Sequence, residues 1–403
     1  MLIHSDRIVL PGRSIAGSIE FDDSGKIVSI NEGSKEADID YGSNTIIPGI
    51  IDTHNHGAAG YRFDQADKKG MEACLKAQAA RGVTGIFPTT TNYDTYSYLV
   101  ELSKENNDGS KVLGIHSEGP WGSRVGEKGI NLGYPKPSLA EAKIYLEKGQ
   151  GFLKLFDIAP EVEEALEVID FLTENGVTVS MFHTNANYKE ACTGVDHGVS
   201  VATHLFNVMT GLHHRDVGTA GAALLKDEVW CELICDGLHV ALEMVKLAMK
   251  MKDHDKIMMI SDNVAFAGAP IGFYDGTAMG SSADSDRALI EVTKEGYCLS
   301  KTGRLSGSSL PVMTGIRNLV KVLGMSLEEV VRMSSYNQSV KYGLATKGEL
   351  VCGTDFDAVV IDDDFNVLAT WVEGRKVFDQ KTDTIPINPQ FLNDYYLGES
   401  KPE

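Results

Sequence analysis

Two histidines close a short apolar run of the sequence and have the spacing of metal ligands on a strand. The run from Ile46 to Ile51 is rich in isoleucine, and Gly57 directly follows the second histidine. Residues two apart on a strand point to the same face, so His54 and His56 can present their imidazoles side by side where the strand opens into a loop. Paired imidazoles suit zinc or another first-row divalent ion. Such a pair taken alone is more often two polar residues in a loop, so the rest of the chain decides between the two interpretations.

Further histidine and carboxylate side chains follow other apolar runs in the same way. In a parallel sheet the carboxyl ends of all strands open on one face, so side chains at these positions converge there. A single buried histidine is usually a satisfied core residue, but that explanation would need a separate coincidence at each strand end. The residues are Glu118, His183, His204, His239 and Asp262. Together with the histidine pair they predict a metal site.

Two β-rich chain ends flank a middle region of a different texture. Short strand patterns with turn signals occupy both ends, so we predict that residues 1–47 and 351–403 pair into one small sheet domain. The predicted strands are 7–10, 17–21, 26–30, 45–47, 358–361, 367–372 and 376–378.

Residues 48–350 alternate between helical periodicity and apolar runs. Repeated β-then-α units indicate an α/β protein with a parallel sheet, and their number favours a (β/α)8 TIM barrel over an open sheet. The segment Gly268–Lys301 interrupts this alternation and is predicted as a long loop or small insertion near the barrel mouth. The predicted helices are 70–81, 96–106, 161–175 and 241–251, and the predicted strands are 83–88, 112–116, 177–182 and 257–261.

Composition excludes several classes of partner. The 403 residues are 42% hydrophobic, enough for one large core or two smaller ones, and the net charge of −20 repels nucleic acid and anionic membrane surfaces. No apolar stretch approaches the ~18 residues of a membrane span, and no signal-peptide pattern opens the sequence. The six cysteines are scattered without a CxxC pair, which is typical of reduced thiols. We therefore expect a cytoplasmic protein.

Several motifs carry a resemblance to a known family. The segment Pro48–Gly57 resembles the first-strand motif of the amidohydrolase superfamily. The order and spacing of the other motifs are similar to those of the N-acetylglucosamine-6-phosphate deacetylase family, and cover nearly the whole chain. They are residues 116–120, 203–209, 236–239, 261–262, 307–310 and 353–362. The resemblance implies a metal-bearing barrel and a small β-sandwich domain built from both chain ends.

The resemblance also implies a role for each matching position in the reaction. Glu118, His183 and His204 match the main metal site. His54 and His56 match a second site that only some members fill; Glu118 could bridge the two ions, and Asp262 could reach the second. Asp262 matches the general acid and base, and His239 matches the group that polarises the acetyl carbonyl. The expected cofactor is one or two divalent ions, with zinc first and iron or manganese as alternatives.

A small phosphorylated amino sugar is the implied substrate. Arg215 matches the phosphate-binding arginine, and its planar fork can grip phosphate with two hydrogen bonds. Asn207 and Val208 match positions near the phosphate or the sugar. The resemblance further implies a homodimer in which the neighbouring subunit helps to complete the phosphate pocket. A surface arginine paired with Asp216 is the alternative interpretation of Arg215.

These residue types support amide hydrolysis in their own right. A bound divalent ion lowers the pKa of its water to about 7 and polarises the carbonyl oxygen. A carboxylate such as Asp262 can take the water proton and return it to the departing amine. A donor such as His239 can stabilise the developing oxyanion, which is worth about 3–4 kcal/mol in comparable sites.

The sequence departs from the family pattern at several positions. Phe182 and Thr184 replace the usual neighbours of the third ligand, Ser117 replaces a leucine, and Asn131 stands where a substrate-site histidine is usual. The segment 121–125 and the pair at 213–214 are also unusual. No metal ligand is lost, but several departures could touch the sugar. Asn131 is therefore a candidate substrate-binding residue, and N-acetylgalactosamine-6-phosphate or another N-acyl sugar is an alternative substrate.

Two other functions fit parts of the sequence. A hydantoinase-like or dihydroorotase-like enzyme would bridge its metals with a carboxylated lysine, and Lys154 superficially fits that position. A non-catalytic sugar-phosphate sensor would keep the pocket, but it would not need the proton shuttle that Asp262 offers.

Overall fold

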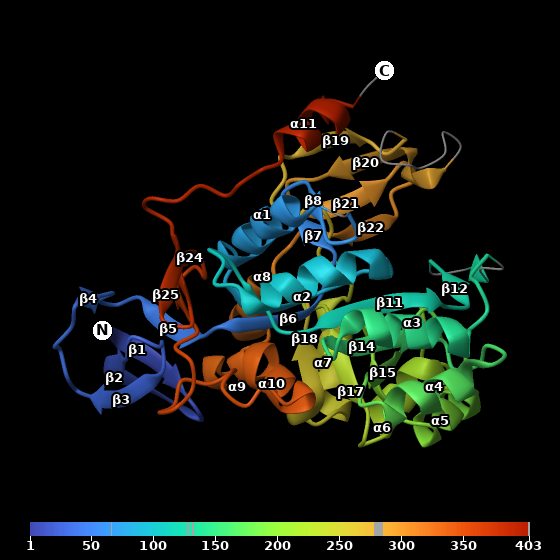
Figure 1. Ribbon diagram of the computed structural model, residues 1–403, viewed down its shortest axis with the longest axis horizontal. Coiled ribbons are helices and arrows are strands. Elements are labelled where there is room, and N and C mark those ends of the chain that lie inside the picture. The colour runs from blue at the N-terminus through green and yellow to red at the C-terminus, as the bar shows by residue number, and fades with distance from the viewer. Residues whose placement is uncertain (66, 127–128, 131–132, 278–284, 402–403) are drawn as a thin grey trace.

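The computed structural model describes residues 1–65, 67–126, 129–130, 133–277 and 285–401. Strands from both chain ends lie at one side of the molecule, and helices surround parallel strands at the other (Figure 1). A third group of strands, between residues 272 and 308, stands above these strands in the same view.

The sheet of the chain ends has eight strands, in the order β25-β24-β23-β5-β1-β2-β3 with β4 beside β1. The two ends meet where β5 and β23 pair antiparallel, with Ile47 opposite Val359. Inside, the rings of Phe21 and Phe356 stack at 4.4 Å, and Trp371 packs edge-on against both. The strands are β1 (Leu2–Leu10), β2 (Arg13–Phe21), β3 (Ile27–Glu32), β4 (Ile39–Asp40), β5 (Thr45–Pro48), β23 (Ala358–Ile361), β24 (Val367–Val372) and β25 (Arg375–Asp379).

The middle region contains two parallel sheets, ordered β10-β9-β6 and β11-β14-β15-β16-β17-β18. Single parallel bridges join Thr89 to His116 and Asn55 to Asn263, between the two sheets. The predicted α/β arrangement with parallel sheets is confirmed. The strands are β6 (Ile50–Asn55), β9 (Val83–Pro88), β10 (Lys111–Val112), β11 (Ile115–Trp121), β14 (Leu153–Ile158), β15 (Thr178–Met181), β16 (Val199–Ala202), β17 (Trp230–Leu233) and β18 (Ile257–Met259).

Helices alternate with these strands and bury one face against them. In α1, for example, Met71, Cys74 and Leu75 recur at helical spacing and are fully buried. The helices are α1 (Lys68–Ala79), α2 (Tyr96–Lys104), α3 (Leu139–Gly149), α4 (Ala165–Glu174), α5 (Tyr188–Asp196), α6 (Gly218–Leu225), α7 (Leu242–Met251), α8 (Val312–Lys321), α9 (Leu327–Val331) and α10 (Asn337–Tyr342). Short 3₁₀ helices are η1 (Tyr93–Thr95), η2 (His254–Lys256) and η3 (Asp286–Ala288), and η4 (Arg332–Tyr336) is a π-helical segment between α9 and α10. Short hairpin strands are β7 (Gly57–Ala58), β8 (Tyr61–Arg62), β12 (Arg124–Val125) and β13 (Gly129–Ile130).

Apolar side chains from several of the parallel strands pack together in a buried cluster. Phe87, Leu155, Val201, Trp230, Met258 and Tyr342 form one buried cluster from different strands and α10. The Thr84 side chain packs closely against the backbone of Gly49 just before β6, because a Cβ on Gly49 would lie 2.1 Å from Thr84 Oγ1. Any larger residue at position 49 would therefore displace Thr84, where the chain enters the strand that carries His54.

The segment predicted as a loop or insertion, Gly268–Lys301, contributes to an antiparallel sheet with the order β22-β21-β20-β19-β26. Its last strand comes from residues far along the chain, because β26 pairs with β19 and helix α11 packs beside them through Phe391. Residues 389–398 therefore do not join the sheet of the chain ends, which corrects the predicted boundary of 351–403. The elements are β19 (Gly272–Asp275), β20 (Leu289–Val292), β21 (Tyr297–Ser300), β22 (Leu305–Ser308), α11 (Pro389–Tyr395) and β26 (Tyr396–Gly398).

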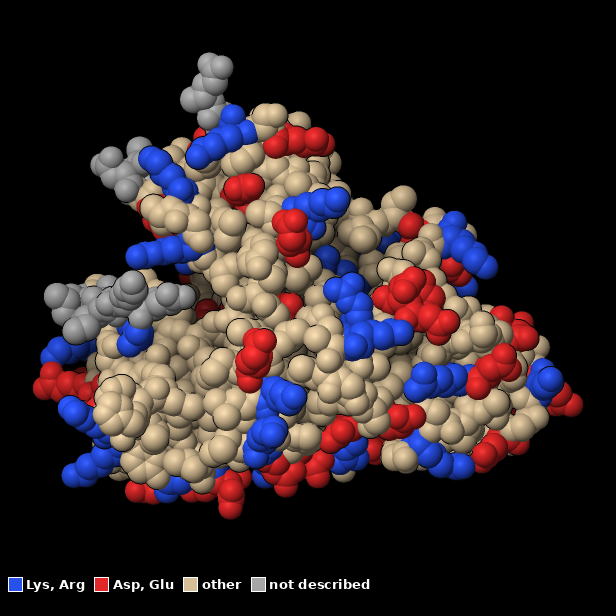
Figure 2. Space-filling model, turned by 180° about the vertical axis from the view of Figure 1, so that it is seen from behind, with Lys and Arg blue, Asp and Glu red and all other residues tan. Residues whose placement is uncertain are grey.

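The surface of the described residues carries mixed charge. On the face shown in Figure 2, Lys and Arg side chains are interspersed with Asp and Glu, and the acids are prominent along the lower edge. Across the described ranges, none of the helices has the length and apolar character needed to cross a membrane.

Candidate metal centre

Six of the predicted side chains form one group, and four histidines among them surround the carboxylate of Glu118. Glu118 Oε1 lies 3.2 Å from His204 Nε2, 3.5 Å from His183 Nε2 and 3.7 Å from His54 Nε2. Glu118 Oε2 lies 3.3 Å from His56 Nε2. These residues come from the ends of four different strands, so the convergence depends on the tertiary fold.

Asp262 completes the group from a fifth strand end. Its Oδ1 lies 3.4 Å from His54 Nε2 and 3.3 Å from His56 Nε2. The ligand atoms form two sets, each within 4.8 Å of one another: His54, His56 and Asp262 in one, and Glu118, His183 and His204 in the other. Glu118 stands between the sets and is positioned to serve both.

Three of these residues have a left-handed backbone conformation, which residues other than glycine rarely adopt. The φ angles of His183, His204 and Asp262 are 38°, 34° and 52°. Such residues cost about 1–3 kcal/mol each and persist where surrounding contacts hold them. Here the Asp262 N–H donates to the carbonyl of His54 at 3.0 Å, which ties two ligands together through the backbone.

Buried carboxylates lie beneath the ligands. His54 Nδ1 is 3.5 Å from Glu232 Oε2, and Thr53 Oγ1 donates to the other oxygen of Glu232 at 2.7 Å. His116 Nε2 lies 2.9 Å from Asp157 Oδ2. A carboxylate on the outer nitrogen of a ligand histidine fixes its tautomer and raises its basicity. At 3.5 Å these two atoms form no hydrogen bond, but the charge of Glu232 favours a proton on His54 Nδ1, which leaves Nε2 free on the side of Glu118 and Asp262.

Burial and neighbouring charges act in opposite directions on the pKa values. Burial lowers the pKa of His56, but Asp262 and Glu118 outweigh it and raise this pKa to about 9. For His183 burial outweighs the charge of Glu118, and the pKa falls to about 4. Burial alone would raise the pKa of Glu118 and Asp262, but the adjacent histidines hold both well below their usual range. Both carboxylates are therefore ionised at neutral pH, the form that binds a cation.

The donor set fits a divalent metal ion. Imidazole nitrogens and carboxylate oxygens are the ligands that zinc, iron and manganese accept in proteins. A cation between these groups would compete with protons for the histidine lone pairs and neutralise the adjacent carboxylates. The described residues therefore could hold one ion in each set.

His239, which the sequence also predicts for the site, is held by a carboxylate of its own. Asp236 Oδ2 is 2.7 Å from His239 Nδ1 and raises the histidine pKa against the effect of burial. The charge of Asp262 acts on this pKa in the same direction. His239 Nε2 is buried and finds no hydrogen-bond partner among the described residues. This nitrogen is therefore available to a bound molecule.

The predicted substrate-binding residues lie beside the candidate metal ligands or in the loop that follows them. Asn207 Nδ2 donates to the His204 carbonyl at 3.1 Å, and the Val208 carbonyl accepts from Thr184 N, so both support the backbone beside the ligands. Arg215 is exposed in the loop that follows. Within the described ranges its side chain forms no ion pair with Asp216, whose Oδ1 instead accepts from the backbone of Gly218. Asn131 lies outside the described residues.

Two groups of site residues were not singled out from the sequence. Asp157 and Glu232 are acids inside otherwise apolar strand runs, and that isolation is the signal that could have found them. Tyr134, whose hydroxyl lies 2.9 Å from His183 Nδ1, stands in an irregular segment with no periodic pattern. Its contact depends on the tertiary fold alone.

The lysine alternative does not fit this arrangement. Lys154 lies on β14 one residue before Leu155, on the opposite face from Asp157, and packs against the backbone of Gly114. Glu118 already occupies the position between the two ligand sets.

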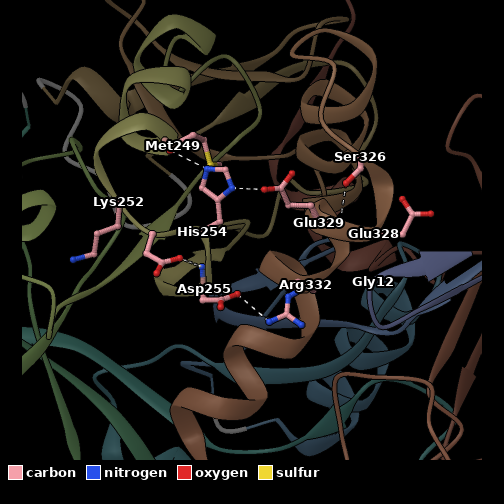
Figure 3. Close-up of a pocket in the computed structure, with 10 residues that line it drawn as sticks. Gly12, Met249, Lys252, His254, Asp255, Ser326, Glu328, Glu329 and Arg332 are labelled. Carbon is pink, nitrogen blue, oxygen red and sulfur yellow. Dashed lines mark hydrogen bonds and ion pairs between the residues drawn. The ribbon is translucent and has the colours of Figure 1, made fainter.

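A cavity of about 610 Å³ lies elsewhere, between the β1–β2 turn and helices α7 and α9. Two pairs among its charged groups contact each other: His254 with Glu329, and Arg332 with Asp255 at 2.9 Å (Figure 3). None of its lining residues belongs to the ligand sets.

Known proteins match the chain over most of its length. The model of the amidohydrolase family matches residues 45–377. An N-acetylglucosamine-6-phosphate deacetylase of Lysinibacillus sphaericus is 33% identical over 337 residues, covering 82% of this chain and 84% of that protein. The chain belongs to the amidohydrolase family. It is a hydrolytic enzyme, and the resemblance inferred from the sequence motifs is confirmed.

Other amidohydrolase relatives bear on the substrate. An N-acetylgalactosamine-6-phosphate deacetylase of Escherichia coli O157:H7 is 29% identical, covering 82% of this chain and 87% of that protein. The crystal structure of the N-acetyl-D-glucosamine-6-phosphate deacetylase of Mycobacterium smegmatis has a TM-score of 0.83 and 28% identity, covering 94% of this chain and 100% of that chain. A variant of that enzyme has been solved in complex with N-acetyl-D-glucosamine-6-phosphate.

Proposed function

We propose that this amidohydrolase removes the acetyl group from N-acetylglucosamine-6-phosphate, giving the amino sugar phosphate and acetate. The observation that carries the proposal is the placement of Asp262 beside two ligand sets that share Glu118. A binding protein would not need a carboxylate of this kind, because binding alone requires no proton transfer. The names of the relatives supply the substrate class.

Each residue contributes a separate part of the chemistry. A divalent ion, when bound by the histidines and Glu118, supplies a water of lowered pKa and a polarised carbonyl. Asp262 accepts the water proton and returns it to the departing nitrogen. His239 is oriented by Asp236, so its Nε2 can donate to the amide oxygen as negative charge develops there.

The phosphate and the sugar define the specificity part of the proposal. Arg215 has no competing ion pair with Asp216 among the described residues, so its guanidinium can bind a phosphate group. N-acetylgalactosamine-6-phosphate is the second candidate, because a relative of nearly equal identity carries that name. The two sugars differ at C4 alone, so they can be compared directly in one assay.

The two parallel sheets are the basis of the proposed domain architecture. We infer that β6, β9, β11, β14, β15, β16, β17 and β18 form a (β/α)8 barrel over residues 48–350, supported by the two single bridges between the parallel sheets. Residues 1–47 and the strands after residue 351 would form a β-sandwich domain. We further propose a homodimer, a cytoplasmic location and zinc as the first choice of metal, with iron and manganese as alternatives.

The test starts from protein stripped of metal. Zinc, iron or manganese is restored separately, and acetate release is measured from N-acetylglucosamine-6-phosphate, its galacto epimer and unphosphorylated N-acetylglucosamine. We expect metal-dependent release from the first sugar phosphate. Release from the epimer alone would shift the assignment to the second candidate. No release from any of the three, with metal demonstrably bound, would contradict the amino-sugar assignment.

A further inference from the structure

The outer nitrogen of one ligand histidine has a neutral partner rather than a carboxylate. Tyr134 Oη lies 2.9 Å from His183 Nδ1, a normal hydrogen-bond distance. His183 Nε2 faces Glu118 at 3.5 Å, so Nδ1 is the nitrogen that carries the proton when Nε2 serves as a ligand. The Nδ1–H group therefore donates, and the phenol oxygen accepts.

The other ligand histidines differ in this respect. His54 Nδ1 stands 3.5 Å from Glu232 Oε2, and both His54 Nδ1 and His204 Nδ1 are buried without a hydrogen-bond partner among the described residues. Within the set formed by Glu118, His183 and His204, Tyr134 therefore supplies the partner that fixes a ring orientation.

The surrounding loop is built to place the Tyr134 ring. A Cβ on Gly122 would lie 2.9 Å from the Tyr134 ring and 3.3 Å from His183 Cβ, so the ring rests on the space that glycine leaves open. The backbone N–H groups of Ser123 and Arg124 both donate to the His183 carbonyl at 2.8 Å. The same segment thus holds the histidine from its backbone side and from its ring side.

We propose that Tyr134 is a positioning residue that sets the metal affinity of the Glu118, His183 and His204 site by orienting His183. The inference rests on the proposed function, because it takes these residues as metal ligands. A tyrosine phenol is uncharged near neutral pH. A neutral acceptor orients His183 without adding a charge beside Glu118.

The test compares metal binding in the wild type and in Tyr134→Phe, which keeps the ring on Gly122 and removes only the oxygen. Tyr98→Phe, on α2 and away from the ligands, is the matched control. Affinity is measured by competition with a chromogenic chelator, and the coordination geometry is followed by the visible absorption of the cobalt-substituted protein. We expect the affinity of Tyr134→Phe to fall about 10- to 100-fold, with a shifted cobalt band.

Different outcomes separate this inference from the proposed function. Unchanged affinity and an unchanged cobalt band in Tyr134→Phe would overturn the positioning role, even if turnover fell. Gly122→Ala, which pushes the ring away, should lower affinity in the same direction, and wild-type affinity in that variant would also contradict the inference. A wild type that binds no metal would instead refute the metal centre itself. The melting temperatures of the metal-free proteins show that each variant is folded.

Discussion

Replacing Lys341 with methionine should stabilise the protein at neutral pH and lose that effect as the pH rises. Lys341 lies in α10, its Nζ donates to Ser200 Oγ at 2.8 Å, and it stands 5.8 Å from the centre of the Trp230 ring. Lys256 Nζ lies 4.4 Å from the same ring. Burial lowers the pKa of Lys341 to about 8 from the ordinary 10.5, and the charge of Lys256 acts in the same direction.

The sign and size of the effect follow from these two pKa values. Between the two values the unfolded chain binds the proton more tightly than the folded protein, so the free energy of unfolding increases with pH in this window. A difference of about 2.5 pKa units corresponds to a penalty of about 3 kcal/mol at pH 7, of which about 1.4 kcal/mol remains near pH 9.5. Losing the hydrogen bond to Ser200 costs about 1 kcal/mol. The net gain from Lys341→Met at pH 7 is therefore about 2 kcal/mol.

The assay is guanidinium unfolding of the wild type and Lys341→Met at pH 7 and pH 9.5. The advantage of the variant should shrink by about 2 kcal/mol between the two conditions. Lys143→Met, at an exposed position on α3, is the matched control and should show no such pH dependence. A difference between wild type and Lys341→Met that is the same at both pH values would refute the reasoning.

Four further predictions concern the metal centre. Asp262→Asn should lower kcat by about 10²- to 10⁴-fold, because the proton shuttle is lost, in assays on samples of known metal content. Arg215→Ala should raise KM for the phosphorylated sugar at least tenfold; an equal effect on the unphosphorylated sugar would exclude a phosphate contact. Glu232→Gln should weaken metal binding about 10- to 100-fold in chelator competition, because His54 loses its carboxylate partner, and wild-type affinity would disprove that link. Removing metal with a chelator should abolish activity and lower Tm, and restoring the ion should reverse both changes.

The sequence predicted those parts of the structure that depend on local pattern. The strand Val83–Pro88 and the strands Ala358–Ile361 and Val367–Val372 have the predicted bounds, because apolar runs with turn signals define their ends. The convergence of His54 and Asp262 followed from the rule that parallel strands end on one face. The antiparallel sheet over residues 272–308 was missed, because its short strands alternate with glycine and charged residues.

The remaining features depend on contacts that no local pattern records. Strand β26 finds its partner more than a hundred residues earlier in the chain, and the hydroxyl of Tyr134 reaches His183 from an irregular segment. Glu232 is buried because His54 and Thr53 surround it, which became visible once the strands were assembled.

The segment that contains α11 is synthesised last, yet it contacts the loop that follows His56 near the start of the chain. Asn388 donates from its backbone to the Ala59 carbonyl at 2.8 Å and from its side chain to the Gly60 carbonyl at 3.0 Å, and Phe391 fills the space above Gly60. These partners are separated by 328 residues, which a ribosome needs roughly 16 to 66 s to add at about 5–20 residues per second. Late in that interval the loop after His56 is held by the backbone carbonyls of residues 263–267 and lacks its contacts with Asn388 and Phe391. The turn at Ala59 and Gly60 is therefore completed late in synthesis, after the strands that carry the candidate ligands have been made.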